Sequence, residues 1–149
     1  MLLTVSFPES ITFKNIFTIV KYMQELIYPQ EIEVRYVIPA LRNAFATEFK
    51  KKGLSQREIA GLLQVRESTI SQYLSKKRGD NASFNPIIQK AIAQAVKRIS
   101  TKEDLIRESQ HILQMIRAKD TIICDLHKKH ANLPADCALC SHHKGVARI

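Results

Sequence analysis

The chain of 149 residues is 45% hydrophobic and 25% charged, which is typical of a folded domain and excludes an intrinsically disordered chain. Its formal charge of +9 favours an anionic partner, namely nucleic acid, a membrane surface or an acidic protein. No apolar run reaches the roughly 20 residues that span a bilayer, no secretory signal is visible, and an odd number of cysteines, all after residue 123, fits a reducing compartment. We therefore expect a cytoplasmic protein without a membrane-spanning segment.

The positive charge is concentrated in the middle of the chain. Residues 35–79 hold ten Lys or Arg residues and three Glu residues, a net charge of +7, whereas the rest of the chain carries only +2. Gly and Pro are scarce, and helical periodicity dominates. We therefore predict an all-α fold and expect the anion-binding site in the central third.

The first predicted helix covers residues 11–27. Its apolar residues share one face, Ser10 is a suitable N-cap, and Pro29 ends the pattern. We assign residues 1–29 as an N-terminal helical extension, to which no motif gives a function.

The second predicted helix spans residues 31–52. Pro39 is expected either to kink this helix or to open it in its first turn. Gly53 is the expected C-terminal stop. The apolar stripe of this helix includes Ile38, Leu41, Phe45 and Phe49.

Two short helical patterns follow within residues 54–79. Ser55 is an N-cap with Glu58 three residues later, as in a capping box. Apolar residues recur at helical spacing in both halves, and they are Ile59, Leu62, Leu63, Ile70, Tyr73 and Leu74. Ala60 is small enough to let the two helices cross closely. Two helices joined by a turn of about four residues predict a helix-turn-helix arrangement.

The outer face of the second short helix is polar and uncharged at its centre. Ser68, Ser71 and Gln72 recur at helical spacing and present short hydrogen-bonding groups in place of long charged ones. An ordinary helical hairpin with a solvated face is the alternative interpretation, and apolar periodicity alone would favour it.

Residues 55–79 resemble the helix-turn-helix of the phage-repressor and Xre-like regulators. The matching positions are the phosphate-binding Gln, the small Ala and the core of that motif, here Gln56, Ile59, Ala60, Leu63, Val65, Ile70, Tyr73 and Leu74. Gln64 departs from the motif, which usually has Gly there, and a positive φ would cost Gln about 1 kcal/mol relative to Gly.

A longer stretch, residues 31–79, is similar to a family of small archaeal transcriptional regulators that also carry a Cys-bearing C-terminus. The resemblance covers roughly residues 30–79 and, loosely, residues 120–140. We therefore assign residues 30–84 as a helix-turn-helix DNA-binding domain.

In this interpretation the second short helix enters the major groove of double-stranded DNA, where Gln pairs with adenine, Arg with guanine and Glu with cytosine. The side chains expected to reach base edges are Arg66, Glu67, Ser68, Ser71 and Gln72. Gln56 is expected to bind phosphate through its amide, and further phosphate contacts are expected from Arg57, Lys76, Lys77 and Arg78.

Residues 85–119 are predicted to form two helices that connect or dimerise the protein. Asn85 with Pro86 is expected to begin the first, and Thr101 with Asp104 the second. Their apolar surface either packs internally or forms a homodimer, which would pair two half-sites about 34 Å apart. The residues concerned are Ile87, Ile88, Ile92, Val96, Ile99, Leu105, Ile112, Leu113 and Ile116.

The tail, residues 120–149, carries a candidate metal site. Two short pairs separated by a loop suit a tetrahedral ion, and the candidate ligands are Cys124, His127, Cys137 and Cys140. Structural Zn²⁺ bound by three thiolates and His127 is one reading, and an iron–sulfur cluster that senses redox state or iron is another. The third is that no metal binds and that Cys137 and Cys140 are free thiols or a reversible disulfide.

These patterns together predict a sequence-specific, DNA-binding transcription regulator that acts as a homodimer. A protein-interaction adaptor, antitoxin-like and reusing the same fold, is the alternative. No Ser or Cys is set beside a base, and no Gly-rich phosphate loop is present, so we do not expect an enzyme.

Overall fold

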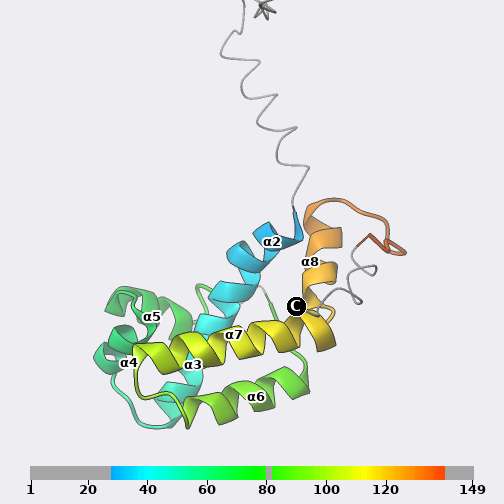
Figure 1. Ribbon diagram of the computed structural model, residues 1–149. Coiled ribbons are helices and arrows are strands. Elements are labelled where there is room, and N and C mark those ends of the chain that lie inside the picture. The colour runs from blue at the N-terminus through cyan, green and yellow to red at the C-terminus, as the bar shows by residue number, and fades with distance from the viewer. Residues whose placement is uncertain (1–27, 80–81, 140–149) are drawn as a thin grey trace, which may run out of the picture.

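Every regular element in the described part of the chain is helical. The computed structural model describes residues 28–79 and 82–139, and no strand occurs among them (Figure 1). The all-α prediction is therefore confirmed for these residues. The predicted helix at residues 11–27, with its cap at Ser10, lies outside them.

The first described helix is continuous but changes its winding in the middle. It consists of α2 (Pro29–Ile32), the π-helical turn η1 (Glu33–Val37) and α3 (Ile38–Lys51). Pro39 has no N–H, and in an α-helix its ring would crowd the carbonyl four residues before it. The wider turn, in which the Ile38 N–H donates to the Glu33 carbonyl, ends just before that ring. Pro39 thus lies in the first turn of α3, one of its two predicted placements.

The helix ends where the sequence predicts. Gly53 has φ +96°, its N–H donates to the Lys50 carbonyl at 3.0 Å, and the Leu54 N–H donates to the Phe49 carbonyl at 3.2 Å. This pair of bonds is a Schellman motif, which needs a left-handed residue at the position of Gly53.

The remaining helices of the described residues are α4 (Gln56–Leu63), α5 (Glu67–Leu74), α6 (Pro86–Val96), α7 (Lys102–Lys119) and α8 (Ile122–His130). Three of them, α4, α6 and α7, begin at predicted caps. Ser55, Asn85 and Thr101 each accept a bond from the backbone three residues on, at 3.3, 3.0 and 3.2 Å. The helical pattern of the tail fades after Leu126 in the sequence, yet α8 continues to His130.

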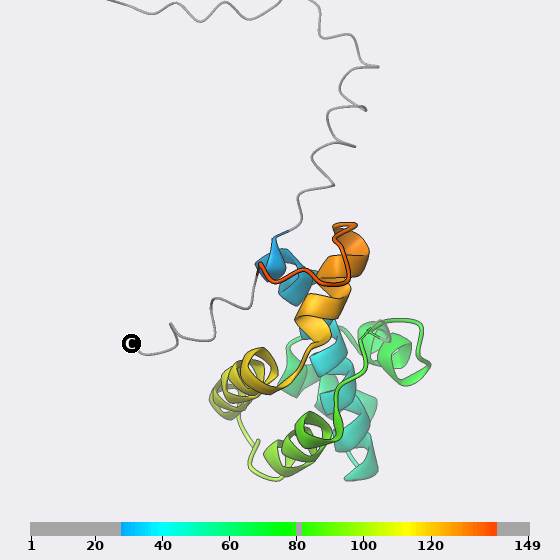
Figure 2. The same cartoon turned by 90° about the vertical axis from the view of Figure 1, so that its right-hand side faces the viewer.

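One hydrophobic core joins these helices around α3. Helix α3 contacts α4 and α5 on one side and α6 on another, and α7 bridges α4 and α6 (Figures 1 and 2). Each fully buried aliphatic or aromatic side chain contributes about 1.5–3 kcal/mol. The largest of them are Ile32, Phe45, Phe49, Ile59, Ile70, Tyr73, Ile88, Ile92, Ile112 and Ile116.

Most of the apolar surface of residues 85–119 is buried within a single chain. Ile88, Ile92, Val96, Ile99, Ile112, Leu113 and Ile116 are all buried in the common core. Leu105 is half-buried, and Ile87 is 57% exposed. Internal packing therefore accounts for most of these residues, and Ile87 is the largely exposed one among them.

The far end of the molecule joins α2 and η1 to α8. The Tyr36 and His130 rings stack with centroids 4.3 Å apart, and Arg117 of α7 pairs with Glu33 through an Nε–Oε2 contact of 3.0 Å. Helix α8 therefore lies beside α2, on the opposite side of the molecule from α4 and α5 (Figure 1).

Candidate nucleic-acid interface

Helix α5 separates an apolar face from a polar one. Ile70 is completely buried and Tyr73 is 1% exposed, because both pack against α3 and α4. Ser68, Ser71 and Gln72 are exposed. Their hydroxyl and amide groups are therefore free to meet a partner outside the chain.

The turn between α4 and α5 is tight and left-handed. Gln64 has φ +53° and ψ +45°, and the Val65 N–H donates to the Ala60 carbonyl at 3.1 Å. The positive φ whose cost at Gln64 the sequence analysis considered is therefore present. The Gln64 side chain compensates in part, since its Nε2 donates to the Gly61 carbonyl at 2.7 Å.

The start of α4 faces solvent and is firmly capped. The Ser55 hydroxyl and backbone N–H both donate to Glu58 Oε2 at 2.7 Å, which completes the predicted capping box. These bonds lower the pKa of the Glu58 carboxyl, and the bond from the Ser55 hydroxyl has the larger effect. Gln56 and Arg57, the first two residues of the helix, are exposed.

The loop after α5 is fixed by hydrogen bonds at both of its ends. Lys76 has φ +58°, its N–H donates to the Tyr73 carbonyl, and the Lys77 N–H donates to the Gln72 carbonyl. Farther along, Asn43 Nδ2 of α3 donates to the Arg78 carbonyl at 3.1 Å. The backbone that carries the three cations is thus tied to α5 and to α3.

Gly79 is required for this close approach. Its φ is +74°, and a Cβ built on it would lie 2.7 Å from the Pro39 carbonyl oxygen and 2.9 Å from the Asn43 Cβ. Sequence reasoning did not identify Gly79 or Asn43, because Asn43 bonds the Arg78 carbonyl across 35 residues and no local pattern links the two segments.

The cations of residues 55–79 have no acidic partner in the described part of the chain. The Arg78 guanidinium lies 6.0 Å from the centroid of the Tyr73 ring, and none of the ion pairs involves residues 55–79. An unpaired, exposed cation keeps its full attraction for an external anion.

All ten predicted DNA-contacting side chains are exposed. They are Gln56, Arg57, Arg66, Glu67, Ser68, Ser71, Gln72, Lys76, Lys77 and Arg78. They belong to α4, α5 and the adjoining turn and loop, which pack together as one unit on α3 (Figure 1).

The predicted metal ligands are only partly described. Cys124 and His127 lie one turn apart on α8, Cys137 follows in the segment after it, and Cys140 lies outside the described residues. Among described residues, no three Cys, His, Asp or Glu side chains come together as a metal site would require. Neither Cys124 nor Cys137 forms a disulfide with a described residue, and zinc, an iron–sulfur cluster and a tail without metal all remain predictions.

No helix in residues 28–79 or 82–139 is long and apolar enough to cross a bilayer. Comparisons with protein-family models, with curated proteins and with solved structures find no match for this chain.

Proposed function

We propose that this chain is a sequence-specific regulator of transcription that binds double-stranded DNA through α5. The observation that carries the proposal is the outer face of α5, which is exposed, polar and uncharged at Ser68, Ser71 and Gln72. A merely solvated helix more often carries long charged side chains there. In the proposed complex the helix enters the major groove, and these side chains read base edges.

Phosphate binding is assigned to the residues that flank this face. Gln56 and Arg57 at the start of α4 contact one strand, and the cations of residues 76–78 contact the backbone beside the groove. The bonds that fix residues 76–79 support this assignment, since cations on an ordered backbone lose less entropy when they bind.

The direct test is binding-site selection from random duplexes, followed by gel shifts at about 0.15 M salt. Gln72→Ala is expected to lower affinity for the selected site about tenfold and to relax the preference at one base position. Gln114→Ala, an exposed Gln on α7, is the matched control and should change neither. Weak binding that ignores sequence would overturn the proposal.

The adaptor alternative makes the opposite forecast for the same variants. If the fold serves protein contacts, Ser71→Ala and Gln72→Ala leave the main activity unchanged, and no duplex is selected. The exposed outer face of α5 leaves room for either partner, but the unpaired cations around it favour the anionic one.

We also propose that two copies act together on DNA, because a single eight-residue helix reads only a short site. Ile87 and Ile106 are the large apolar residues of the predicted dimerisation region that remain largely exposed. Sedimentation of the DNA complex, with selected half-sites about 34 Å apart, tests this arrangement.

The tail is proposed to hold Zn²⁺ or an iron–sulfur cluster. The proposed DNA contacts do not involve the tail. Elemental analysis of anaerobically purified protein, with a visible absorption spectrum, distinguishes the two, since iron–sulfur clusters absorb in the visible range and Zn²⁺ does not. Protein that binds neither metal would remove the tail from the proposal and leave α5 unaffected.

A further inference from the structure

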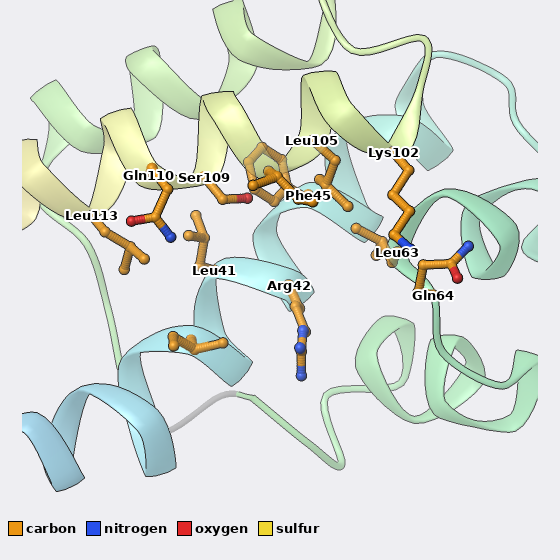
Figure 3. A pocket seen from close by; sticks show the side chains of 12 residues that line it. Leu41, Arg42, Phe45, Leu63, Gln64, Lys102, Leu105, Ser109, Gln110 and Leu113 are labelled. Carbon is orange, nitrogen blue, oxygen red and sulfur yellow. The ribbon is translucent and has the colours of Figure 1, made fainter.

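A cleft of about 300 Å³ lies between α3, the end of α4 and α7 (Figure 3). This volume is at the lower end of the range for small-molecule sites. Its apolar lining comes from all three helices: Leu41, Phe45, Leu63 and Leu113 are almost fully buried, whereas Ile38, Leu105 and Ile106 expose more of their side chains. The cleft therefore offers an apolar surface to an aliphatic group.

The charge of the cleft is entirely positive. Arg42 and Lys102 line it and no acidic residue does. Both side chains are exposed, and neither forms a hydrogen bond or an ion pair with a described residue. Lys102 is the first residue of α7, whose first turn also carries Glu103 and Asp104, but neither of these acids lines the cleft.

The close view shows how polar and apolar groups are arranged. Lys102 and Gln64 lie at one end of the cleft, Gln110 and Leu113 lie at the other, and Arg42 extends from α3 between them (Figure 3). An apolar surface with cations at its edge matches a molecule that has an aliphatic body and one negative group.

We propose that this cleft binds a small amphipathic carboxylate. Its aliphatic chain packs on Leu105 and Ile106, and its carboxylate lies between Arg42 and Lys102. A second copy of the chain fits less well, because a two-fold arrangement would bring the same unpaired cations face to face.

Such a ligand would also contact the unit of α4, α5 and their adjoining turn and loop, residues 55–79, which is proposed to bind DNA. Leu63 and Gln64 line the cleft, and they are the last residue of α4 and the first of the turn that leads into α5. A ligand held against them and α7 favours one placement of α5, so it changes affinity for DNA. This regulatory step rests on the proposed function, whereas carboxylate binding itself does not.

Titration of the full chain with octanoate, followed by calorimetry and amide NMR, tests the binding. We expect one site, with shifts around Leu63 and Leu105, and no saturable binding of octylamine. The Arg42→Gln/Lys102→Gln variant should bind octanoate roughly five- to tenfold more weakly. Lys90→Gln/Lys97→Gln, which removes the same charge from exposed sites on α6 and just after its end, is the control and should bind normally.

Filling the cleft gives an independent check. Ser109→Trp should abolish binding while circular dichroism shows an unchanged helix content, and the charge variants decide the matter if this variant misfolds. Equal binding of octylamine, or unchanged affinity in the Arg42/Lys102 variant, would overturn the proposal.

Gel shifts with and without octanoate separate the two claims. A changed affinity for DNA supports regulation through the cleft. Octanoate binding with unchanged DNA affinity removes the regulatory step, and octanoate binding by a chain that selects no duplex leaves the carboxylate site in place and removes the proposed function.

Discussion

Two regions of this molecule carry three arginines each and use them differently. Around α7 every arginine has an acidic partner: Arg98 with Glu108, Arg107 with Asp104, and Arg117 with Glu33. In the unit formed by α4, α5 and the following loop, none of Arg57, Arg66 and Arg78 has one among the described residues. Both regions bury apolar side chains on their inner faces, and they differ in whether the arginines of their outer faces are paired.

The ion pairs around α7 affect the pKa of the acidic partner. The Arg98 guanidinium donates two bonds to Glu108, at 2.8 and 2.6 Å, and holds the pKa of that carboxyl below its usual value. Exposed pairs of this kind stabilise a fold by at most about 1 kcal/mol. They do neutralise charge, and a region that leaves its charges unpaired is the one equipped to attract an anion.

The sharpest test of this comparison removes three cations from each region. Lys76→Gln/Lys77→Gln/Arg78→Gln should weaken DNA binding about a hundredfold at 0.15 M salt and reduce the slope of log K against log salt by about three, because each phosphate contact releases roughly one counterion. Gel shifts across a salt series measure both effects.

The matched variant takes the same charge from around α7. Arg98→Gln/Arg107→Gln/Arg117→Gln should change affinity for DNA only slightly, since those charges are already neutralised within the chain. Equal losses in the two variants would mean that binding follows net charge and that the location of the cations is irrelevant.

A somewhat smaller effect, on stability, is expected at Gly79, which holds the loop of residues 76–79 against α3. Gly79→Ala places a Cβ against the Pro39 carbonyl at a positive φ, so the free energy of unfolding should fall by about 2 kcal/mol. Urea denaturation gives this value from the transition midpoint.

Gly61→Ala is the control for that substitution. A Cβ at Gly61, in α4, meets no atom within 4 Å, and Ala is the better helix former. The free energy of unfolding should therefore rise by about 0.5–1 kcal/mol. A destabilised Gly61→Ala variant would show that α4 is packed more tightly than the structure indicates.

A smaller effect on the free energy of unfolding is expected at Ser55, the N-cap of α4. Ser55→Ala removes the hydroxyl that bonds Glu58, and the free energy of unfolding should fall by about 1 kcal/mol, whereas Ser68→Ala on the exposed face of α5 should change it by less than about 0.5 kcal/mol. Thermal or urea unfolding compares the two variants.

The same variant has a consequence for pH. Because hydrogen bonds lower the pKa of Glu58 in the folded chain, their contribution to stability is present above the ordinary carboxyl pKa and is lost as pH falls through the lowered value. In Ser55→Ala the pKa of Glu58 should rise toward its ordinary value, which carboxyl NMR titration measures. An unchanged pKa would assign the shift to the remaining backbone bond.

Local sequence signals predicted where most helices begin, but they did not predict contacts between residues far apart in the sequence. Ser55, Asn85 and Thr101 cap their helices as expected because a cap depends on neighbours three residues away. The wide turn at Glu33–Val37, by contrast, was not foreseen, although Pro39 marked the place.

The candidate site divides in the same way. Exposure of Ser68, Ser71 and Gln72 follows from the apolar residues opposite them on the same helix. The Asn43–Arg78 bond that fixes the loop and the cleft between Arg42 and Lys102 join segments far apart in sequence. Only packing brings such residues together, so periodicity and spacing carry no trace of them.

The smallest expected effect concerns the turn at Gln64, where the two regions meet. Gln64→Gly relieves the left-handed backbone, worth about 1 kcal/mol, but it also removes the 2.7 Å bond from Nε2 to the Gly61 carbonyl, worth about 0.5–1 kcal/mol at most at an exposed site. The free energy of unfolding should therefore rise by no more than about 0.5 kcal/mol. Gln64→Ala loses the bond and keeps the strained backbone, so urea unfolding should show a decrease of about 0.5–1 kcal/mol. A stabilised Gln64→Ala variant would mean that the side chain strains the turn, and that the αL conformation there is held by the packing of α5 and not by the amide.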